Sequence, residues 1–115
     1  MEDMKKRALM QMGTCFKAVR TECGFTQEQM ANFLDVDRTM ITKFEKGERS
    51  LGVADLERAC ELFGCSIKVF RGAETFKPMA VAYRAKELTA EDMEAVRKVQ
   101  KIMLNLRRVK EYGKE

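Results

Sequence analysis

The sequence predicts an all-α protein, with several short helices in its first two thirds and one long helix at its C-terminus. Apolar residues recur at steps of three and four along most of the chain, which is the spacing of one face of an α-helix. Residues that favour helix N-caps and C-terminal glycines stand where these stretches begin and end. The 115 residues suffice for one small domain with an appended element, and oligomerisation is a natural way for such a chain to bury more surface.

A first helix is expected from near Asp3 to Glu22, ended by Gly24. Gly13 interrupts its apolar stripe and costs about 1 kcal/mol relative to alanine, so the segment before it is either part of a longer first helix or a separate arm. The basic run at residues 5–7 is then either a solvated helix face, which we favour, or an arm that contacts a nucleic-acid backbone. The stripe consists of Leu9, Met12, Phe16, Val19 and Cys23.

Two short helices joined by a tight turn are expected between Phe25 and Gly47. Thr26 and Gln29 form a capping box for the first of them, Asp37 is placed to cap the second, and glycine 47 ends it. The residues expected to point inward are Met30, Ala31, Phe33, Leu34, Val36, Met40, Ile41 and Phe44. The second helix leaves a polar and basic face outward, made of Arg38, Thr39, Thr42, Lys43 and Lys46. This is the physical description of a DNA-reading helix-turn-helix.

Three groups of residues in this stretch resemble the Cro and phage-repressor family of helix-turn-helix proteins, also called the xenobiotic response element family. They are the opening at residues 24–27, Met30-Ala31-x-x-Leu34, and Ile41-x-x-Phe44-Glu45-x-Gly47. The likeness extends from about residue 13 to residue 70, half of the chain. The resemblance implies a five-helix, lambda-repressor-like domain. It also implies an ion pair between Arg20 and Glu45, and a glutamine at position 27 that binds a phosphate and supports the reading helix.

The fourth helix of such a domain is expected to bury Val53, Leu56, Ala59, Cys60 and Phe63 and to end at Gly64. Residues 66–70 are ambiguous: family position favours a short helix, whereas the alternation of Ile67 and Val69 favours a strand, and we favour the helix. The organisation expected is a helix-turn-helix domain at 1–72, a linker at 73–88 that is extended near 79–83, and a C-terminal helix at 89–115.

Thr89 is expected to cap this last helix, which begins with acidic residues and ends with basic ones, as the helix dipole favours. Its apolar stripe must be buried somewhere. The stripe either folds back on its own domain or pairs with a second copy, and we favour a homodimer because the five-helix domain is complete without it. The residues assigned to this dimerisation are Val96, Val99, Met103 and Leu106.

Residues near the start of a reading helix enter the major groove most deeply. Arg38, Thr39 and Lys43 are therefore the predicted base contacts, since arginine can bond guanine O6 and N7 and threonine can meet a thymine methyl group. The predicted phosphate contacts are Gln27, Thr42, Lys46, Arg49 and the backbone N–H of Val53 at the start of the fourth helix.

Two positions depart from the family pattern. Asp35 replaces the glycine that commonly takes a positive φ in the turn, and aspartate tolerates that conformation better than most residues. Leu51 and Gly52 replace the proline and the serine-like cap that precede the fourth helix in the family.

The chain contains no histidine, and its four cysteines, at 15, 23, 60 and 65, lack the spacing of a zinc site, so we expect no metal, no cofactor and reduced thiols. No nucleophile–base pattern is visible, which argues against an enzyme. The charged first residues and the lack of a long apolar run predict a soluble cytoplasmic protein without a membrane segment.

The most plausible function is a sequence-specific, dimeric transcriptional repressor of double-stranded DNA, with an operator of two half-sites about one helical turn (~34 Å) apart. The charge of the reading domain qualifies this prediction, because residues 13–63 contain seven basic and nine acidic side chains, a net charge of −2. An alternative is therefore a protein-interaction module, resembling an antitoxin or an immunity repressor, that binds a regulatory partner such as a toxin or a peptidase through the C-terminal helix.

Overall fold

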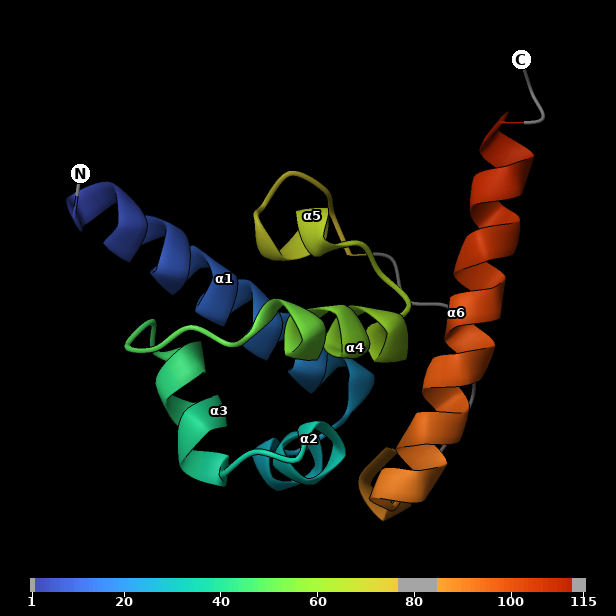
Figure 1. Cartoon of the computed structure of the whole chain (residues 1–115), viewed down its shortest axis with the longest axis horizontal. Coiled ribbons are helices and arrows are strands. Elements are labelled where there is room, and N and C mark those ends of the chain that lie inside the picture. The colour runs from blue at the N-terminus through green and yellow to red at the C-terminus, as the bar shows by residue number, and fades with distance from the viewer. Residues whose placement is uncertain (1, 77–84, 113–115) are drawn as a thin grey trace.

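The computed structural model describes residues 2–76 and 85–112, and every regular element within these ranges is helical. This confirms the all-α prediction, including the helical choice for residues 67–70. The expected extended stretch at 79–83 lies outside the described residues. The elements are α1 (Glu2–Cys23), α2 (Gln27–Leu34), α3 (Arg38–Glu45), α4 (Val53–Phe63), α5 (Ile67–Phe70), the 3₁₀ turn η1 (Ala85–Glu87) and α6 (Ala90–Tyr112) (Figure 1).

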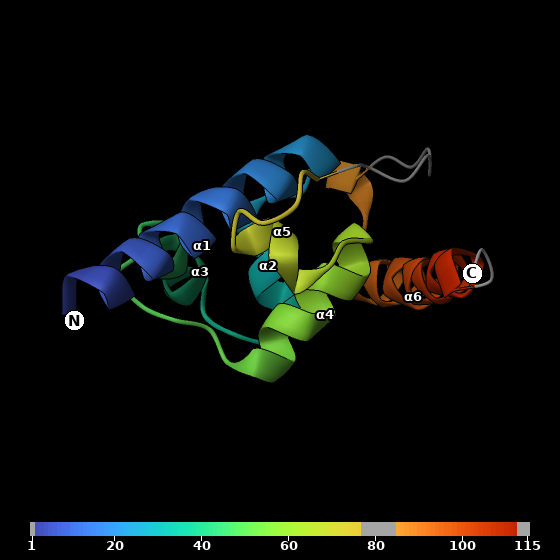
Figure 2. The same cartoon turned by 90° about the horizontal axis from the view of Figure 1, so that it is seen from above.

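Helix α1 continues through Gly13 without a break, so the segment before this glycine is a longer first helix. The reason is packing: a Cβ atom at Gly13 would lie 2.2 Å from the backbone oxygen of Phe44 at the end of α3. The glycine thus lets α1 cross α3 closely instead of ending the helix. The N-terminal turns of α1 extend beyond the other helices of the domain (Figures 1 and 2).

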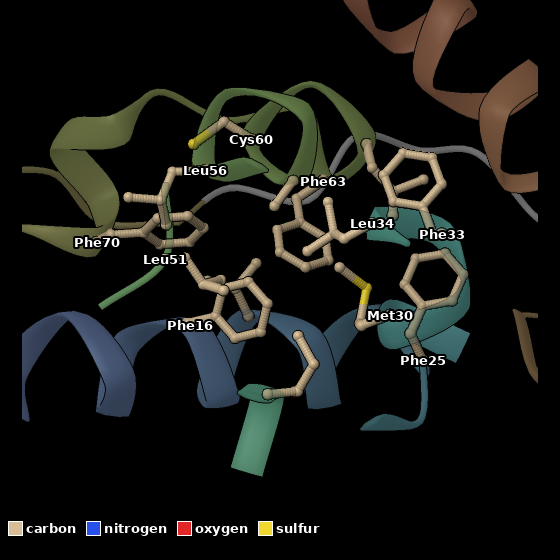
Figure 3. Packing of buried hydrophobic residues seen from close by; sticks show 14 of the residues in the cluster. Phe16, Phe25, Met30, Phe33, Leu34, Leu51, Leu56, Cys60, Phe63 and Phe70 are labelled. Carbon is tan, nitrogen blue, oxygen red and sulfur yellow. The ribbon is translucent and has the colours of Figure 1, made fainter. Parts of the chain in front are cut away.

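The core of the domain is built around Phe16, which projects from α1 toward Phe63 of α4 and Phe70 of α5 (Figure 3). The ring of Phe16 lies 5.7 Å from that of Phe63, 5.6 Å from that of Phe70 and 5.2 Å from that of Phe44, centroid to centroid. All four rings are at most 1% exposed. These contacts tie α1, α3, α4 and α5 to one centre, so α3 rests on a fixed base.

Helix α4 buries a wider face than the sequence indicated. Leu62, which the expected stripe omitted, is completely buried, because α4 packs against α1, α2, α5 and α6. Val53, which the stripe included, is instead 73% exposed, since it stands at the first position of the helix. Leu51 in the preceding loop is buried in the core, where it occupies the position of the family's proline.

Helix α6 lies beside the α1–α5 domain and contacts α4 and α2 (Figures 1 and 2). Thr89 caps it as expected: its hydroxyl accepts from the N–H of Asp92, and the Asp92 carboxylate accepts from the N–H of Thr89. Met93 is completely buried and Val96 is partly buried against the core. No helix in the described ranges is long and apolar enough to span a membrane.

Candidate nucleic-acid interface

The chain between α2 and α3 has the geometry of a tight helix-turn-helix connection. The capping box predicted at the start of α2 is present, with the Thr26 hydroxyl accepting from the N–H of Gln29 and the Gln29 side chain accepting from the N–H of Thr26. Asp35 ends α2 in the left-handed region, at φ 55°, as expected for a residue in place of glycine. Asp37 occupies the N-cap position of α3, but its side chain makes no capping hydrogen bond, so this part of the expectation is wrong.

Helix α3 has one buried and one exposed face. Ile41 and Phe44 are at most 1% exposed and Met40 is partly buried, as the sequence predicted. The outward face presents Arg38, Thr39 and Lys43 to solvent from the first two turns. Because the apolar face is fixed in the core, the exposed face has a defined direction.

A buried ion pair holds the C-terminal end of α3 to α1, as the resemblance implied. Arg20 Nε donates to Glu45 Oε2 at 2.7 Å and Arg20 Nη2 donates to Glu45 Oε1 at 3.1 Å. Arg20 Nη1 donates to the carbonyl oxygen of Phe25 at 2.8 Å, just before α2. One guanidinium therefore fixes three segments, and both charged residues are less than 10% exposed.

Gln27 extends this network to the outward side of α3. Its Nε2 donates to Glu45 Oε1 at 3.0 Å, and its Oε1 accepts from the Thr42 hydroxyl at 3.1 Å. The Thr42 hydroxyl also lies 3.2 Å from the carbonyl oxygen of Arg38. Gln27 thus braces α3 at two points, while one hydrogen of its amide group remains for another acceptor.

The remaining predicted phosphate ligands lie around the loop between α3 and α4. Lys46 and Arg49 are exposed, and glycine 47 between them has φ 77°. Helix α4 begins after Gly52, which has no side chain with which to cap the helix, so the N–H groups near Val53 are open to an external acceptor. Asp55 in the first turn opposes an anion there.

A set of contacts that the sequence did not indicate ties α6 to the same domain. Arg97 of α6 bonds Glu94 on its own helix and Glu61 of α4, the latter at 2.9 Å. The Arg97 guanidinium holds the pKa of the Glu94 carboxyl below its usual range. Arg58 of α4 reaches Glu94 of α6 at 3.5 Å. The same guanidinium donates to the carbonyl oxygen of Phe33 in α2 at 3.0 Å and lies 4.7 Å from the centre of its ring. The sequence does not show which charged residues of two different helices meet, so these pairs could not be predicted from it.

Gln29 contributes a further tie through its Nε2 atom, which donates to the carbonyl oxygens of Ala85 at 2.6 Å and Leu88 at 3.1 Å. The capping residue of α2 therefore also holds the chain that leads into α6. The helix-turn-helix is thus hydrogen-bonded to the segment that leads into α6.

The four cysteines are free thiols. Burial, aided by the charge of Glu22, raises the pKa of Cys23 to about 12. The Cys60 side chain, by hydrogen bonding, and burial raise the pKa of Cys65 well above its ordinary value. Such thiols stay protonated and act as small apolar groups. No cluster able to hold a metal ion occurs in the part of the chain that the structure describes.

Comparison with known proteins agrees with this geometry. The family described as "Helix-turn-helix" matches residues 16–70. A competence pilus inhibition repressor from Acinetobacter baylyi is 32% identical to this chain over 66 residues, which are 56% of this chain and 60% of the relative. The chain thus spans about 60% of the length of the curated relative it matches. No solved structure gives a significant match.

Proposed function

Because residues 16–70 are a DNA-binding helix-turn-helix domain of the Cro and phage-repressor type, we propose that the chain is a sequence-specific transcriptional repressor that binds its operator as a homodimer. The name of the bacterial relative supports repression over activation. A repressor of this kind acts by occupying a promoter, so it needs neither a catalytic group nor a cofactor. Because its proposed ligand is double-stranded DNA, we expect the protein to act in the cytoplasm.

The observation that carries the proposal is the bracing of α3. The network of Arg20, Glu45 and Gln27 fixes a helix whose exposed side chains are those suited to base edges. A surface that only faces water has no need of a buried charge network beneath it. Rigid support of the reading side chains is what sequence discrimination requires.

In the proposed complex Arg38, Thr39 and Lys43 contact bases, and Lys46 and Arg49 contact phosphates, together with the N–H of Val53. Gln27 offers its free amide hydrogen to a phosphate while it braces α3. Thr42 acts mainly within the protein, because its one hydroxyl hydrogen already has two acceptors, Gln27 Oε1 and the carbonyl oxygen of Arg38. It would have to rotate to bind a phosphate.

The proposed dimer contact is the exposed apolar stripe of α6. Val99 is 53% exposed, Met103 is 39% exposed and Leu106 is 59% exposed, with Ile102 beside them at 60%. These four recur at steps of three, one and three, so they share one face of the helix. Val96 borders this face but is partly buried against its own domain, so the proposed dimer contact consists of the other three predicted residues and Ile102.

Two substitutions on α3 test the reading surface. DNA selected from a random pool supplies a specific site, and fluorescence titration compares this site with unrelated duplex. Arg38→Ala should abolish the preference, at about 1–3 kcal/mol, whereas Lys46→Ala should weaken both duplexes equally. Identical behaviour of the two variants would refute the assignment of α3, and absence of DNA binding by the wild type at low salt would refute the function.

Glutamate substitutions on the apolar stripe of α6 test the proposed dimer contact. Removing the whole helix would also remove buried Met93 and expose the part of the core against which it packs, so point changes are preferable. Ile102→Glu with Leu106→Glu should give monomers in sedimentation with unchanged far-UV circular dichroism. A matched control is Lys98→Gln with Asn105→Glu, which makes the same change of −2 in net charge at exposed polar positions of the same helix. A variant that stays dimeric would contradict the assignment.

The alternative is a protein-interaction module, and the same exposed stripe favours it, because an apolar helix face also fits a groove on another protein. The two functions differ in their response to DNA. A module that works only through protein partners would bind neither selected nor random duplex at any salt concentration.

A further inference from the structure

The N-terminal extension of α1, residues 4–12, carries positive charge without an evident structural task. Lys5, Lys6 and Arg7 are exposed, as are Met4 and Ala8 beside them. Cations near a helix N-terminus oppose the helix dipole, so these residues do not stabilise the helix in which they lie. The extension contains no acidic residue, although Glu2 and Asp3 precede it in the sequence.

Two glycines fix where the extension runs. At Gly13, α1 crosses the end of α3 so closely that a Cβ atom would lie 2.2 Å from the carbonyl oxygen of Phe44. One turn earlier, Met10 passes over Gly47, where a Cβ atom would lie 2.6 Å from the Met10 Cγ. The extension therefore follows the loop that leaves the reading helix, and its direction is set by close packing at two points.

Helical periodicity then places the charges. Lys6 precedes Met10 by four residues, so it lies on the same side of α1, one turn nearer the N-terminus. Lys5 and Arg7 flank it. The loop on this side carries the exposed Lys46 and Arg49, with Glu48 between them. Residues 5–7 and 46–49 are about 40 residues apart in the sequence, and both thus place basic side chains at the same end of α3.

We propose that residues 5–7 are part of the DNA-binding surface and contact phosphates beyond those reached by the helix-turn-helix. The extension projects about 13 Å past Gly13, at 1.5 Å per residue, and residues 5–7 lie about 9–12 Å past it. This length corresponds to several base-pair steps of 3.4 Å. It would supply the positive charge that the reading domain, at a net −2 over residues 13–63, lacks. The inference rests on the proposed function.

The salt dependence of binding to a 40-bp random-sequence duplex tests it. Each phosphate contact contributes about 0.9 to the slope of log K against log salt concentration. The variant with Lys5→Gln, Lys6→Gln and Arg7→Gln should lose two to three phosphate contacts, which is about 1.8 to 2.7 units of slope. The ratio of the wild-type binding constant to that of the variant should shrink by roughly 10- to 40-fold between 50 and 200 mM KCl. Its preference for the selected site over random duplex should be unchanged.

Two controls separate position from charge. Lys68→Gln, Lys86→Gln and Lys98→Gln together remove three exposed lysines from α5, η1 and α6, and should keep the wild-type slope. Lys5→Arg, Lys6→Arg and Arg7→Lys together retain the charge and should also keep it. If the wild type binds DNA and the glutamine variant at residues 5–7 shows the same salt slope, this inference is wrong but the proposed function stands. Absence of salt-dependent binding by the wild type would overturn it together with the proposed function.

Discussion

Helices α3 and α6 both present a face to solvent, but they differ in the chemistry of that face and in how they are held. The exposed face of α3 is polar and basic, whereas α6 exposes an apolar stripe between Val99 and Leu106. Helix α3 is fixed by the buried pair of Arg20 and Glu45, while α6 is fixed by the partly exposed Arg97. Ion pairs of similar length therefore serve two helices in very different surroundings.

The difference in burial determines how much each attachment contributes. A buried pair loses little to solvent screening, and breaking it leaves an uncompensated charge in the interior. A partly exposed pair is screened and replaceable by water. The reading helix should thus be sensitive to single charge changes, and α6 should depend more on its apolar contacts.

The largest effect is expected at Arg20. Replacing Arg20 with methionine leaves the Glu45 carboxylate buried without its main partner, and should lower the free energy of unfolding by about 3–5 kcal/mol. Urea denaturation measures this loss. The double variant Arg20→Met with Glu45→Met removes both charges and should recover most of the stability. A double variant as unstable as the single one would show that the two residues do more than pair with each other.

The next effect compares two methionines on α6. Met93 is completely buried, so Met93→Ala should cost about 2–5 kcal/mol of stability, whereas Met103 is 39% exposed. Met103→Ala should change the stability of the monomer by less than about 0.5 kcal/mol and instead weaken self-association. Denaturation at low concentration and sedimentation separate the two quantities. Equal losses of stability would mean that both faces of α6 contact the same domain.

The smallest effect is expected at Arg97. Arg97→Gln should cost about 1 kcal/mol or less at neutral pH, because the pair is partly exposed. The folded-state pKa of Glu94 is lowered by Arg97, so the pair's contribution is present above the ordinary glutamate pKa and is lost as the pH falls through the lowered value.

The difference in unfolding free energy between the wild type and Arg97→Gln should therefore be constant from about pH 7 to pH 5. It should shrink below about pH 4. Asp92, whose pKa is lowered by hydrogen bonds from Thr89, contributes equally to both proteins and cancels. A difference that grows on acidification would contradict the assignment.

The parts of the fold set by local patterns were predictable. The capping box of Thr26 and Gln29 and the inward face of α3 follow from residue type and spacing within a few positions, whereas the left-handed Asp35 was expected from the family's turn glycine. The pairing of Arg20 with Glu45 is separated by 25 residues and came from resemblance to a family. Local chemistry and a known pattern together sufficed for the helix-turn-helix.

Contacts of α6 were less predictable, because they depend on which sides of two helices meet. The spacing of its apolar residues indicated one stripe, whereas the structure divides them between two sides: Met93 and Val96 are packed on the domain, and residues 99–106 carry the exposed set. Periodicity gives the apolar residues of a helix but not the position of its neighbours. The same limit explains why Leu62 was missed on α4.

Gln100 adds a consequence for the position of α6. It is 3% exposed and lies over Gly64, where a Cβ atom would be 3.1 Å from its amide nitrogen, and its Oε1 has no hydrogen-bond partner among the described residues. A buried acceptor without a partner costs about 1–3 kcal/mol. At 1.4 kcal/mol per factor of ten, this raises the population of molecules with α6 undocked by roughly 5- to 150-fold. The docking of α6 is therefore weaker by this factor than the burial of Met93 and the ion pairs of Arg97 alone would make it.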